Sequence, residues 1–183
     1  MTEAVIVATA RSPIGRANKG SLVDLRPDDM SAQIVKALME KVPQVKQDQV
    51  EDLIMGIGQP AGEGGFNIAR ATAVLAGLED VPGVTVNRYC SSSLQTIRMA
   101  AHAIKAGEGD CFIAAGVEAV SRYAAGFSDS APNPIFKEPG ARTKLRAEGG
   151  QPTWTAPSGL PDMYIAMGQT AENVREVENV SRE

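Results

Sequence analysis

Short apolar runs alternate with helical segments along the first 120 residues of the chain. The strand-like runs cover residues 4–9, 53–58, 84–87 and 111–116. The segments between them carry apolar residues at helical spacing over residues 28–41, 68–76 and 91–106. Because parallel strands joined by helices need right-handed crossovers, this order predicts the α/β class, with a mainly parallel sheet covered on both faces.

Local signals support these boundaries. The run at residues 4–9, AVIVAT, is continuously apolar and β-branched, which predicts a strand buried on both faces. Asn67 is expected to cap the helix that starts at Ile68, and Gly77 is a natural end for that helix. Gly107 has the same role after the next helix.

The composition changes after Val120. Residues 121–162 hold six prolines and show no clean period, and they are too many for a simple connection. Four aromatic side chains give this stretch something to bury: Tyr123, Phe127, Phe136 and Trp154. We therefore expect an inserted, loop-rich region followed by a helix over residues 165–178. The predicted domains are residues 1–120 and 121–183.

Charge and hydropathy exclude several classes of partner. The net charge is −4 and the Lys and Arg residues are scattered, which argues against a nucleic-acid partner. No apolar run approaches the roughly 18 residues of a membrane span, so no membrane partner is expected. The start of the chain has an acidic Glu3 and no basic region typical of a signal peptide. These features predict a cytoplasmic protein.

Cysteine and histidine are scarce. The chain has two cysteines, Cys90 and Cys111, too few for a disulfide scaffold, and no cluster with zinc spacing. Its one histidine is His102. A Cys–His dyad or a Ser–His–Asp triad could therefore use only His102, and a two-histidine metal site cannot be built. We predict no metal site.

The segment at residues 84–94 is the best candidate for chemistry. A strand leads into a short turn that holds Cys90, and a helix follows at once. Free N–H groups and the positive dipole at a helix start favour a thiolate, and they can also stabilise an oxyanion. The short side chains of Ser91, Ser92 and Ser93 keep the approach open. The alternative is that Cys90 is a small buried hydrophobe at a strand end.

The motif N-x-x-C-S-S-S-L-Q around Cys90 resembles the nucleophile motif of the thiolases. Other thiolase motifs follow in order: A-T-A-R-S-P-I-G at residues 8–15, N-I-A-R at 67–70, A-G-L at 76–78, A-G-V-E-A-V-S at 115–121 and M-G-Q-T-A-E-N-V at 167–174. Val117 and Val120 depart from the residues most common in the family. The resemblance extends over nearly the whole chain.

The resemblance implies acyl transfer through an acyl-Cys90 intermediate. A 3-ketoacyl-CoA would be cleaved to acetyl-CoA and a shortened acyl-CoA, as in β-oxidation, or formed in the reverse Claisen condensation. Coenzyme A and acyl-CoA are substrates, and no permanently bound cofactor is implied. The family fold is a layered α-β-α arrangement of two similar halves, with a mixed sheet and a loop domain inserted in the first half. A homodimer or homotetramer is also implied.

The resemblance assigns other residues as well. Met167 matches the loop-domain segment that lines the coenzyme A tunnel, although it could be a core methionine. Many short-chain members have histidine just before this methionine. Ala166 stands there instead, which leaves room for a longer or bulkier acyl group. Arg70 and Glu118 are expected to be buried or interface scaffold, and Asn87 to shape the nucleophile turn.

The remaining cysteine is expected to be structural, and the histidine is expected to be structural or exposed. Cys111 lies in an apolar strand. His102 lies about 18 Å along the helix from Cys90, too far to act as its base. Gly56 to Ala61 match a G-x-G-x-x-A pattern, but Pro60 and the glycines that follow delay the next helix, so a dinucleotide site is not favoured.

Thiolases also use a second cysteine and histidines near the carboxyl end, and no residue here matches them. We expect the chain to cover most of the first half and the start of the loop domain, and to be inactive alone. One alternative is a non-catalytic or split subunit that needs a complementary carboxyl-terminal thiolase half. Another is a related ketosynthase-type condensing enzyme, which the M-G-Q-T-A-E stretch disfavours.

Overall fold

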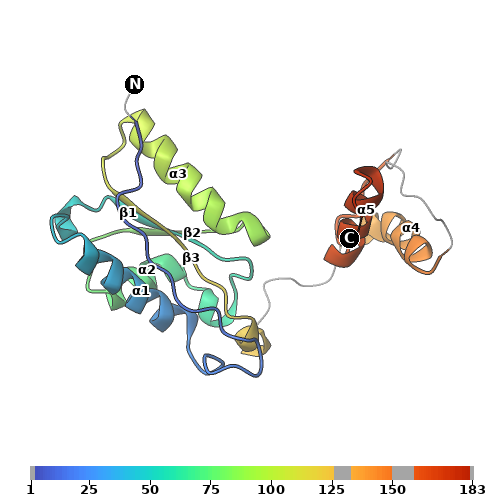
Figure 1. Ribbon diagram of the computed structural model, residues 1–183, viewed down its shortest axis with the longest axis horizontal. Coiled ribbons are helices and arrows are strands. Elements are labelled where there is room, and N and C mark those ends of the chain that lie inside the picture. Colours follow the sequence, from blue (N-terminus) through green and yellow to red (C-terminus); the bar gives the residue numbers. More distant parts are fainter. Residues whose placement is uncertain (1–2, 126–132, 150–158, 182–183) are drawn as a thin grey trace. The chain divides into compact units, whose positions relative to one another are not determined.

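The computed structural model describes residues 3–125, 133–149 and 159–181 (Figure 1). The chain forms two compact units, residues 1–129 and residues 130–183. The first unit is built on a sheet, and helices α4 and α5 make up most of the described part of the second.

Three parallel strands form the sheet of the first unit. Strand β1, Asp52–Gly56, lies at the centre, with β2, Gly83–Val86, on one side and β3, Phe112–Gly116, on the other. Both pairings are parallel, and Ile54 of β1 lies opposite Val84 and Ala114. The predicted parallel α/β sheet is therefore confirmed for these three strands.

Helices cover both faces of this sheet. Helices α1, Pro27–Lys41, and α2, Ile68–Leu75, lie on one face, and α3, Ser92–Ala106, lies on the other (Figure 1). Leu53 and Met55 of β1 pack with the α1 and α2 side chains and are almost fully buried. Burial of each such side chain stabilises the fold by about 1.5–3 kcal/mol.

Glycine ends two of the helices, as the sequence predicts. Gly77 follows α2 with φ 84°, and Gly107 follows α3 with φ 78°, both in the left-handed region that glycine adopts without strain. Asn67 precedes α2 but does not cap it through its side chain. Its side-chain amide instead donates to the Gly83 carbonyl oxygen at 2.7 Å, and its side-chain oxygen accepts from the Thr85 hydroxyl at 2.8 Å.

The strand predicted at residues 4–9 is wrong. This segment is extended, but it joins no sheet among the described residues, and Val5, Ile6 and Val7 are 71–73% exposed. The Thr9 carbonyl oxygen accepts from the Lys41 ammonium group at 2.9 Å. β-Branched residues favour a pleated, buried surface, but a strand also needs a neighbour to pair with.

The second unit contains α4, Lys137–Ala147, and α5, Met167–Val177. Arg146 of α4 hydrogen-bonds Asn173 and forms an ion pair with Glu176 at 2.7 Å, which joins the two helices. Helix α5 confirms the helix predicted over residues 165–178.

Helix α4 was not predicted, because the stretch was expected to be loop-rich. It is polar on most sides, and Pro139 and Gly140 interrupt any apolar period. Pro139 lies in the first turn, where a missing N–H breaks no helical hydrogen bond. Phe136 packs edge-on against Tyr164, with ring centres 5.7 Å apart. Phe127 and Trp154 lie outside the described residues, and the assignment of this unit to a loop domain stays a prediction.

Candidate functional site

The turn between β2 and α3 places Cys90. Tyr89 has φ 45°, and its backbone N–H donates to the Asn87 side-chain oxygen at 2.7 Å. A 3₁₀ turn over Tyr89–Ser91 follows and leads into α3. The prediction that Asn87 shapes this turn is confirmed. Cys90 is exposed, so within this unit it is not a buried hydrophobic cysteine, which was the alternative.

Two hydroxyl side chains fix the start of α3. The Ser92 hydroxyl accepts from the Arg88 N–H at 2.8 Å and donates to the Tyr89 carbonyl oxygen at 2.6 Å. The Thr96 hydroxyl lies 2.7 Å from the Ser93 carbonyl oxygen and 3.1 Å from that of Ala115 in β3. Ser92 and Thr96 are buried, so these bonds are shielded from water and hold the turn rigidly.

Glycines at the strand ends let α3 approach the sheet closely. A Cβ added at Gly56 would lie 2.5 Å from the backbone carbon of Ser92, and one at Gly116 would lie 2.6 Å from the Ser93 Cβ. Any larger side chain at either position would push the first turn of α3 away. The close approach places Cys90 at the carboxyl ends of the parallel strands, where ligands bind in open α/β sheets.

A hollow of about 550 Å³ opens beside Cys90. Its lining includes the ends of β1 and β3, the nucleophile turn, and side chains that follow β3. Glu118 and Tyr123 are among the last group. The site thus combines an exposed thiol, a helix start and a concave surface at one edge of the sheet.

Glu118 and Tyr123 form a polar pair at the rim of this hollow. The Glu118 carboxylate accepts from the Gly58 N–H at 2.7 Å, which ties the segment after β3 to the end of β1. Burial raises the pKa of Tyr123, and its hydrogen bond to Glu118 and the charge of Cys90 raise this pKa further. Tyr123 therefore stays a neutral hydroxyl donor at neutral pH. Glu118 has the expected scaffold role through this hydrogen bond, although Glu118 is exposed and not buried.

Sequence reasoning missed the place of Tyr123 at this site. The signal available was its position shortly after a strand whose carboxyl end faces the nucleophile turn. Ser92 and Thr96 were also missed as anchors. Their hydrogen bonds to the backbone of the turn and of β3 depend on the packing of α3.

Cys111 and Arg70 have structural roles, whereas His102 lies on the surface. Burial raises the pKa of the Cys111 thiol, and the charge of Glu51 raises it further, so this thiol is held in its unreactive form. His102 is exposed on α3. Arg70 donates to the backbone oxygens of Val81 at 2.8 Å and Glu79 at 2.7 Å, which matches its predicted scaffold role.

A family model described as the thiolase N-terminal domain matches residues 4–183. The chain belongs to the thiolase family. This confirms the resemblance drawn from the nucleophile motif and agrees with the parallel sheet and its helices.

Curated thiolases are similar to the chain over its full length. The 3-ketoacyl-CoA thiolase of Bacillus subtilis is 40% identical over 184 residues, which cover 100% of this chain and 42% of that protein. The β-ketoadipyl-CoA thiolase of Acinetobacter baylyi is 44% identical over 189 residues, which cover 100% and 45%. The 3-oxoadipyl-CoA/3-oxo-5,6-dehydrosuberyl-CoA thiolase of Escherichia coli is 39% identical, with the same coverage of 100% and 45%. The chain spans less than half the length of these relatives.

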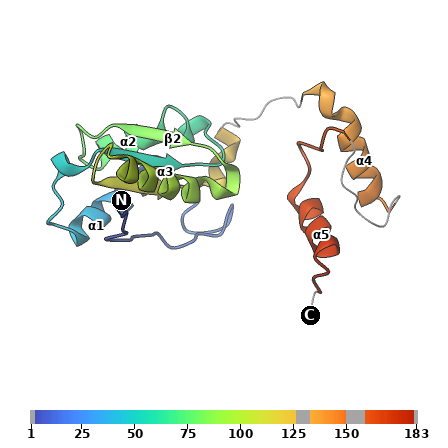
Figure 2. The ribbon, with the colours of Figure 1, turned by 90° about the horizontal axis from the view of Figure 1, so that it is seen from above.

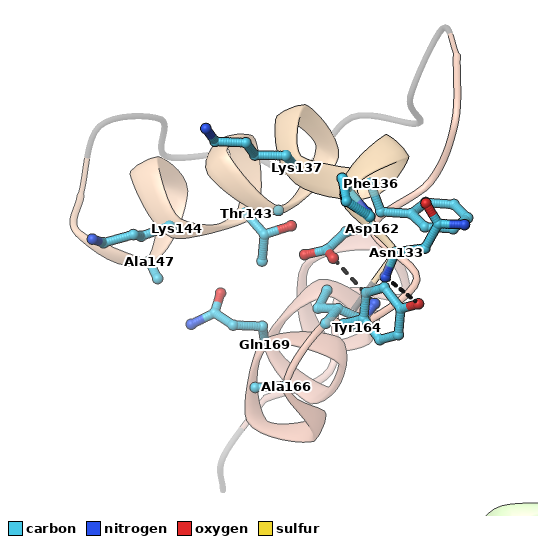
Figure 3. Close-up of a pocket in the computed structure, with 13 residues that line it drawn as sticks. Asn133, Phe136, Lys137, Thr143, Lys144, Ala147, Asp162, Tyr164, Ala166 and Gln169 are labelled. Carbon is cyan, nitrogen blue, oxygen red and sulfur yellow. Dashed lines mark hydrogen bonds between the residues drawn. The ribbon is translucent and has the colours of Figure 1, made fainter. Parts of the chain in front are cut away.

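The second unit of this thiolase chain holds Met167, the predicted coenzyme A residue. Met167 is the first residue of α5 and is 69% exposed, so within this unit it is not a core methionine. The preceding Ala166 helps to line a hollow of about 520 Å³ between α4 and the segment before α5 (Figure 3). The role of Met167 stays a prediction.

Figure 3 shows how this second hollow is organised. At one end, the Tyr164 hydroxyl accepts from the Asn133 N–H at 3.0 Å, and the Asp162 carboxylate accepts from the Tyr164 N–H at 3.2 Å. Thr143 of α4 and Gln169 of α5 point toward the space between the helices. The hollow thus receives a polar side chain from each helix, and the rest of its lining includes the apolar residues Phe136 and Ile165.

No helix in the described part of the chain is long and apolar enough to cross a membrane. Within the same residues, no group of three or more His, Cys, Asp or Glu side chains is placed to hold a metal ion.

Proposed function

We propose that this chain supplies the nucleophile half of a thiolase-type acyltransferase, with Cys90 as the residue that carries the acyl group. The observation that supports it is the exposed thiol at the start of α3, on the carboxyl edge of the sheet beside a concave surface. N–H groups at a helix start favour a thiolate and stabilise the oxyanion formed when that thiolate attacks a carbonyl.

The proposed reaction has two half-reactions. The Cys90 thiolate attacks the 3-keto carbon of a 3-ketoacyl-CoA, and the bond between C2 and C3 breaks. Carbon C2 takes a proton and leaves as acetyl-CoA, while the shortened acyl group stays on Cys90 as a thioester. The thiol of coenzyme A then loses its proton and attacks this thioester, which releases the shortened acyl-CoA and the Cys90 thiolate.

The substrate class is a 3-ketoacyl-CoA, and coenzyme A is the second substrate. No permanently bound cofactor is needed for these steps. Ala166 stands where many short-chain members carry histidine, which supports a longer or bulkier acyl group. The names of relatives that act on 3-ketoacyl-CoA and β-ketoadipyl-CoA agree with this class. We assign Met167 to the coenzyme A side, since it is exposed at the start of α5.

The proton-transfer groups of the reaction come from outside this chain. The one histidine, His102, lies on α3 too far from Cys90 to act as its base, and Cys111 is partly buried. We therefore propose that the chain is inactive alone. It works with a complementary carboxyl-terminal thiolase half, in a cytoplasmic homodimer or homotetramer of the completed enzyme.

A second candidate is a non-catalytic or split subunit that supplies dimer contacts as well as Cys90. Leu94 and Ile97 favour it, since these apolar side chains on α3 are 66% and 44% exposed. Their exposure suits a surface that another chain covers.

The test is the intact mass of the chain after incubation with acetyl-CoA. The carboxyl-terminal portion of the Bacillus subtilis relative is added in one sample and omitted in the other. We expect the mass of one acetyl group on the parent chain and on Cys111→Ser when that portion is present. Neither Cys90→Ser nor the chain alone should gain it. An adduct that survives Cys90→Ser would refute the assignment, and an adduct on the chain alone would refute its inactivity.

A further inference from the structure

A short 3₁₀ helix after β3, Val120–Ala125, forms one wall of the hollow beside Cys90. In Figure 2 this helix, in gold, lies at the same end of the sheet as the start of α3. Side chains three residues apart lie on the same face of a 3₁₀ helix, and Val120 and Tyr123 both line the hollow. The helix therefore has an inner face that borders the hollow and an outer face that does not.

Three contacts hold the outer face of this helix. The Ser121 hydroxyl accepts from the Asn18 N–H at 2.9 Å. The Arg122 guanidinium donates to the Asp24 carbonyl oxygen at 3.3 Å, and two of its nitrogens bond the two carboxylate oxygens of Glu63. The Glu63 side chain is only 16% exposed, so water and salt screen this ion pair less than one on the open surface.

A second link ties the same wall to the sheet from the side of the hollow. The Glu118 carboxylate accepts from the Gly58 N–H at 2.7 Å and forms a hydrogen bond with Tyr123. A Cβ added at Gly58 would lie 2.8 Å from a Glu118 carboxylate oxygen, so this contact is close. Glu118 and Glu63 thus join the segment after β3 to the segment after β1 at two points.

We infer that Tyr123 limits the width of the acyl group on Cys90, and that Glu63 is a positioning residue that holds Tyr123 in place through Arg122. This inference rests on the proposed function, since it takes the hollow as the place of the acyl group. Tyr89 also lines the hollow, but it is 60% exposed, whereas Tyr123 is partly buried and lies next to the anchored arginine. A ring that is held in place sets a boundary, and a ring that can turn into solvent does not.

The test compares two alkylating reagents on the full chain, because alkylation of Cys90 needs no partner half. The Cys90 sulfur displaces iodide from iodoacetamide and from its wider N-phenyl derivative. Peptide mass spectrometry follows each rate at Cys90 separately from Cys111. Tyr123→Ala should raise the rate of the wide reagent relative to the small one by about tenfold. Tyr123→Phe keeps the ring and should stay close to the ratio of the parent chain.

Variants outside the hollow test the positioning role. Glu63→Gln should raise the same ratio about threefold, because loss of the ion pair lets Tyr123 move. Arg122→Gln should do the same from the other side of the pair. Arg26→Gln is the matched control: Arg26 also pairs with Glu63, at 2.9 Å, but lies outside the segment that carries Tyr123, so the ratio should not change. When Tyr123 is already alanine, Glu63→Gln should add nothing, since no ring is left to hold.

Several outcomes would overturn the inference. Equal ratios for Tyr123→Ala and Tyr123→Phe would refute the width limit. Equal ratios for Glu63→Gln and Arg26→Gln, or an effect of Glu63→Gln that persists without the ring, would refute the positioning role. Circular dichroism shows which variants are folded, and if Tyr123→Ala is not, the comparison of the Glu63, Arg122 and Arg26 variants decides.

The proposed function is judged separately, by the acetyl adduct on Cys90. Shifted alkylation ratios without that adduct would support the Tyr123 wall and refute the acyl-transfer role. An adduct with unshifted ratios would do the reverse.

Discussion

The two edge strands of the sheet, β2 and β3, differ in how other residues cover their outer sides. Along β2, the Asn67 side-chain amide donates to the Gly83 carbonyl oxygen, and the Thr85 hydroxyl donates to the Asn67 side-chain oxygen. Along β3, the outward N–H groups meet no described strand, and the apolar segment at residues 4–9 stays 71–73% exposed at Val5, Ile6 and Val7. An edge is covered when nearby sequence supplies side chains for it.

The largest effect should come from crowding the covered edge. A Cβ at Gly83 would lie 2.6 Å from the backbone nitrogen of Arg70 and 2.8 Å from the backbone carbon of Ala69. Backbone cannot rotate away as a side chain can, so Gly83→Ala should lower the free energy of unfolding by about 2–3 kcal/mol. Urea unfolding followed by circular dichroism measures this.

The matched control for this crowding is Ala114→Val on the open edge. Ala114 is exposed, so the added methyl groups meet solvent and the change should stay within about 0.5 kcal/mol. Equal losses for Gly83→Ala and Ala114→Val would mean that the two edges are equally packed.

A smaller effect should follow loss of the side chain that covers β2. Asn67→Ala removes the bonds to Gly83 and Thr85 and also leaves alanine at φ 53°, so we expect a loss of about 1–2 kcal/mol. Asn67→Gly removes the same bonds but tolerates this φ, and should lose less. Thermal unfolding of the two variants separates the backbone effect from the hydrogen bonds. A larger loss for the glycine variant would contradict this explanation.

The smallest effect should come from the segment that follows β3. Ion pairs anchor this segment, whereas the β3 edge itself has no described partner strand. Arg122 and Arg26 both form ion pairs with Glu63. The hydrogen bond from Arg122 lowers the pKa of Glu63, and burial opposes this shift. The unfolded chain therefore binds more protons than the folded chain between the folded pKa and the ordinary glutamate value, about 4.3.

This shift gives a pH dependence with a definite sign. The stabilisation by Glu63 is fully present above about pH 4.3 and is lost as the pH falls through its lower folded pKa. Unfolding of the parent chain and of Glu63→Gln, compared between neutral pH and pH 3, should show the difference between them shrink at acid pH. A difference that is unchanged or larger at acid pH would show that Glu63 acts through packing instead of charge.

Local patterns predict most elements of the first unit, and the two wrong predictions have different causes. The helices at Pro27, Ile68 and Ser92 begin where apolar spacing and turn residues predict, because these signals act over a few neighbouring residues. Residues 4–9 have the same strand composition as β1 but no partner, and pairing cannot be seen in one segment alone. Helix α4 was missed because its polar sequence shows no apolar stripe.

The candidate site also has features that local sequence predicts and features that depend on long-range contacts. Cys90 was found from its place between a strand and a helix, and the Asn87 contact that shapes the turn spans only two residues. The position of Tyr123 and Glu118 after a strand was a sequence signal, but their closeness to this turn also requires that β3 lies beside β1, which only the fold shows.

The sequence by itself determined the order of strands and helices, the nucleophile turn at Cys90 and membership of the thiolase family. Each of these is written in short-range patterns that act before the chain is folded. Tertiary structure alone decided which strand edges are paired, which side chains surround the thiol, and that residues 4–9 remain exposed. Those outcomes depend on contacts between residues far apart in the chain, whose free energy exists only when both partners are in place.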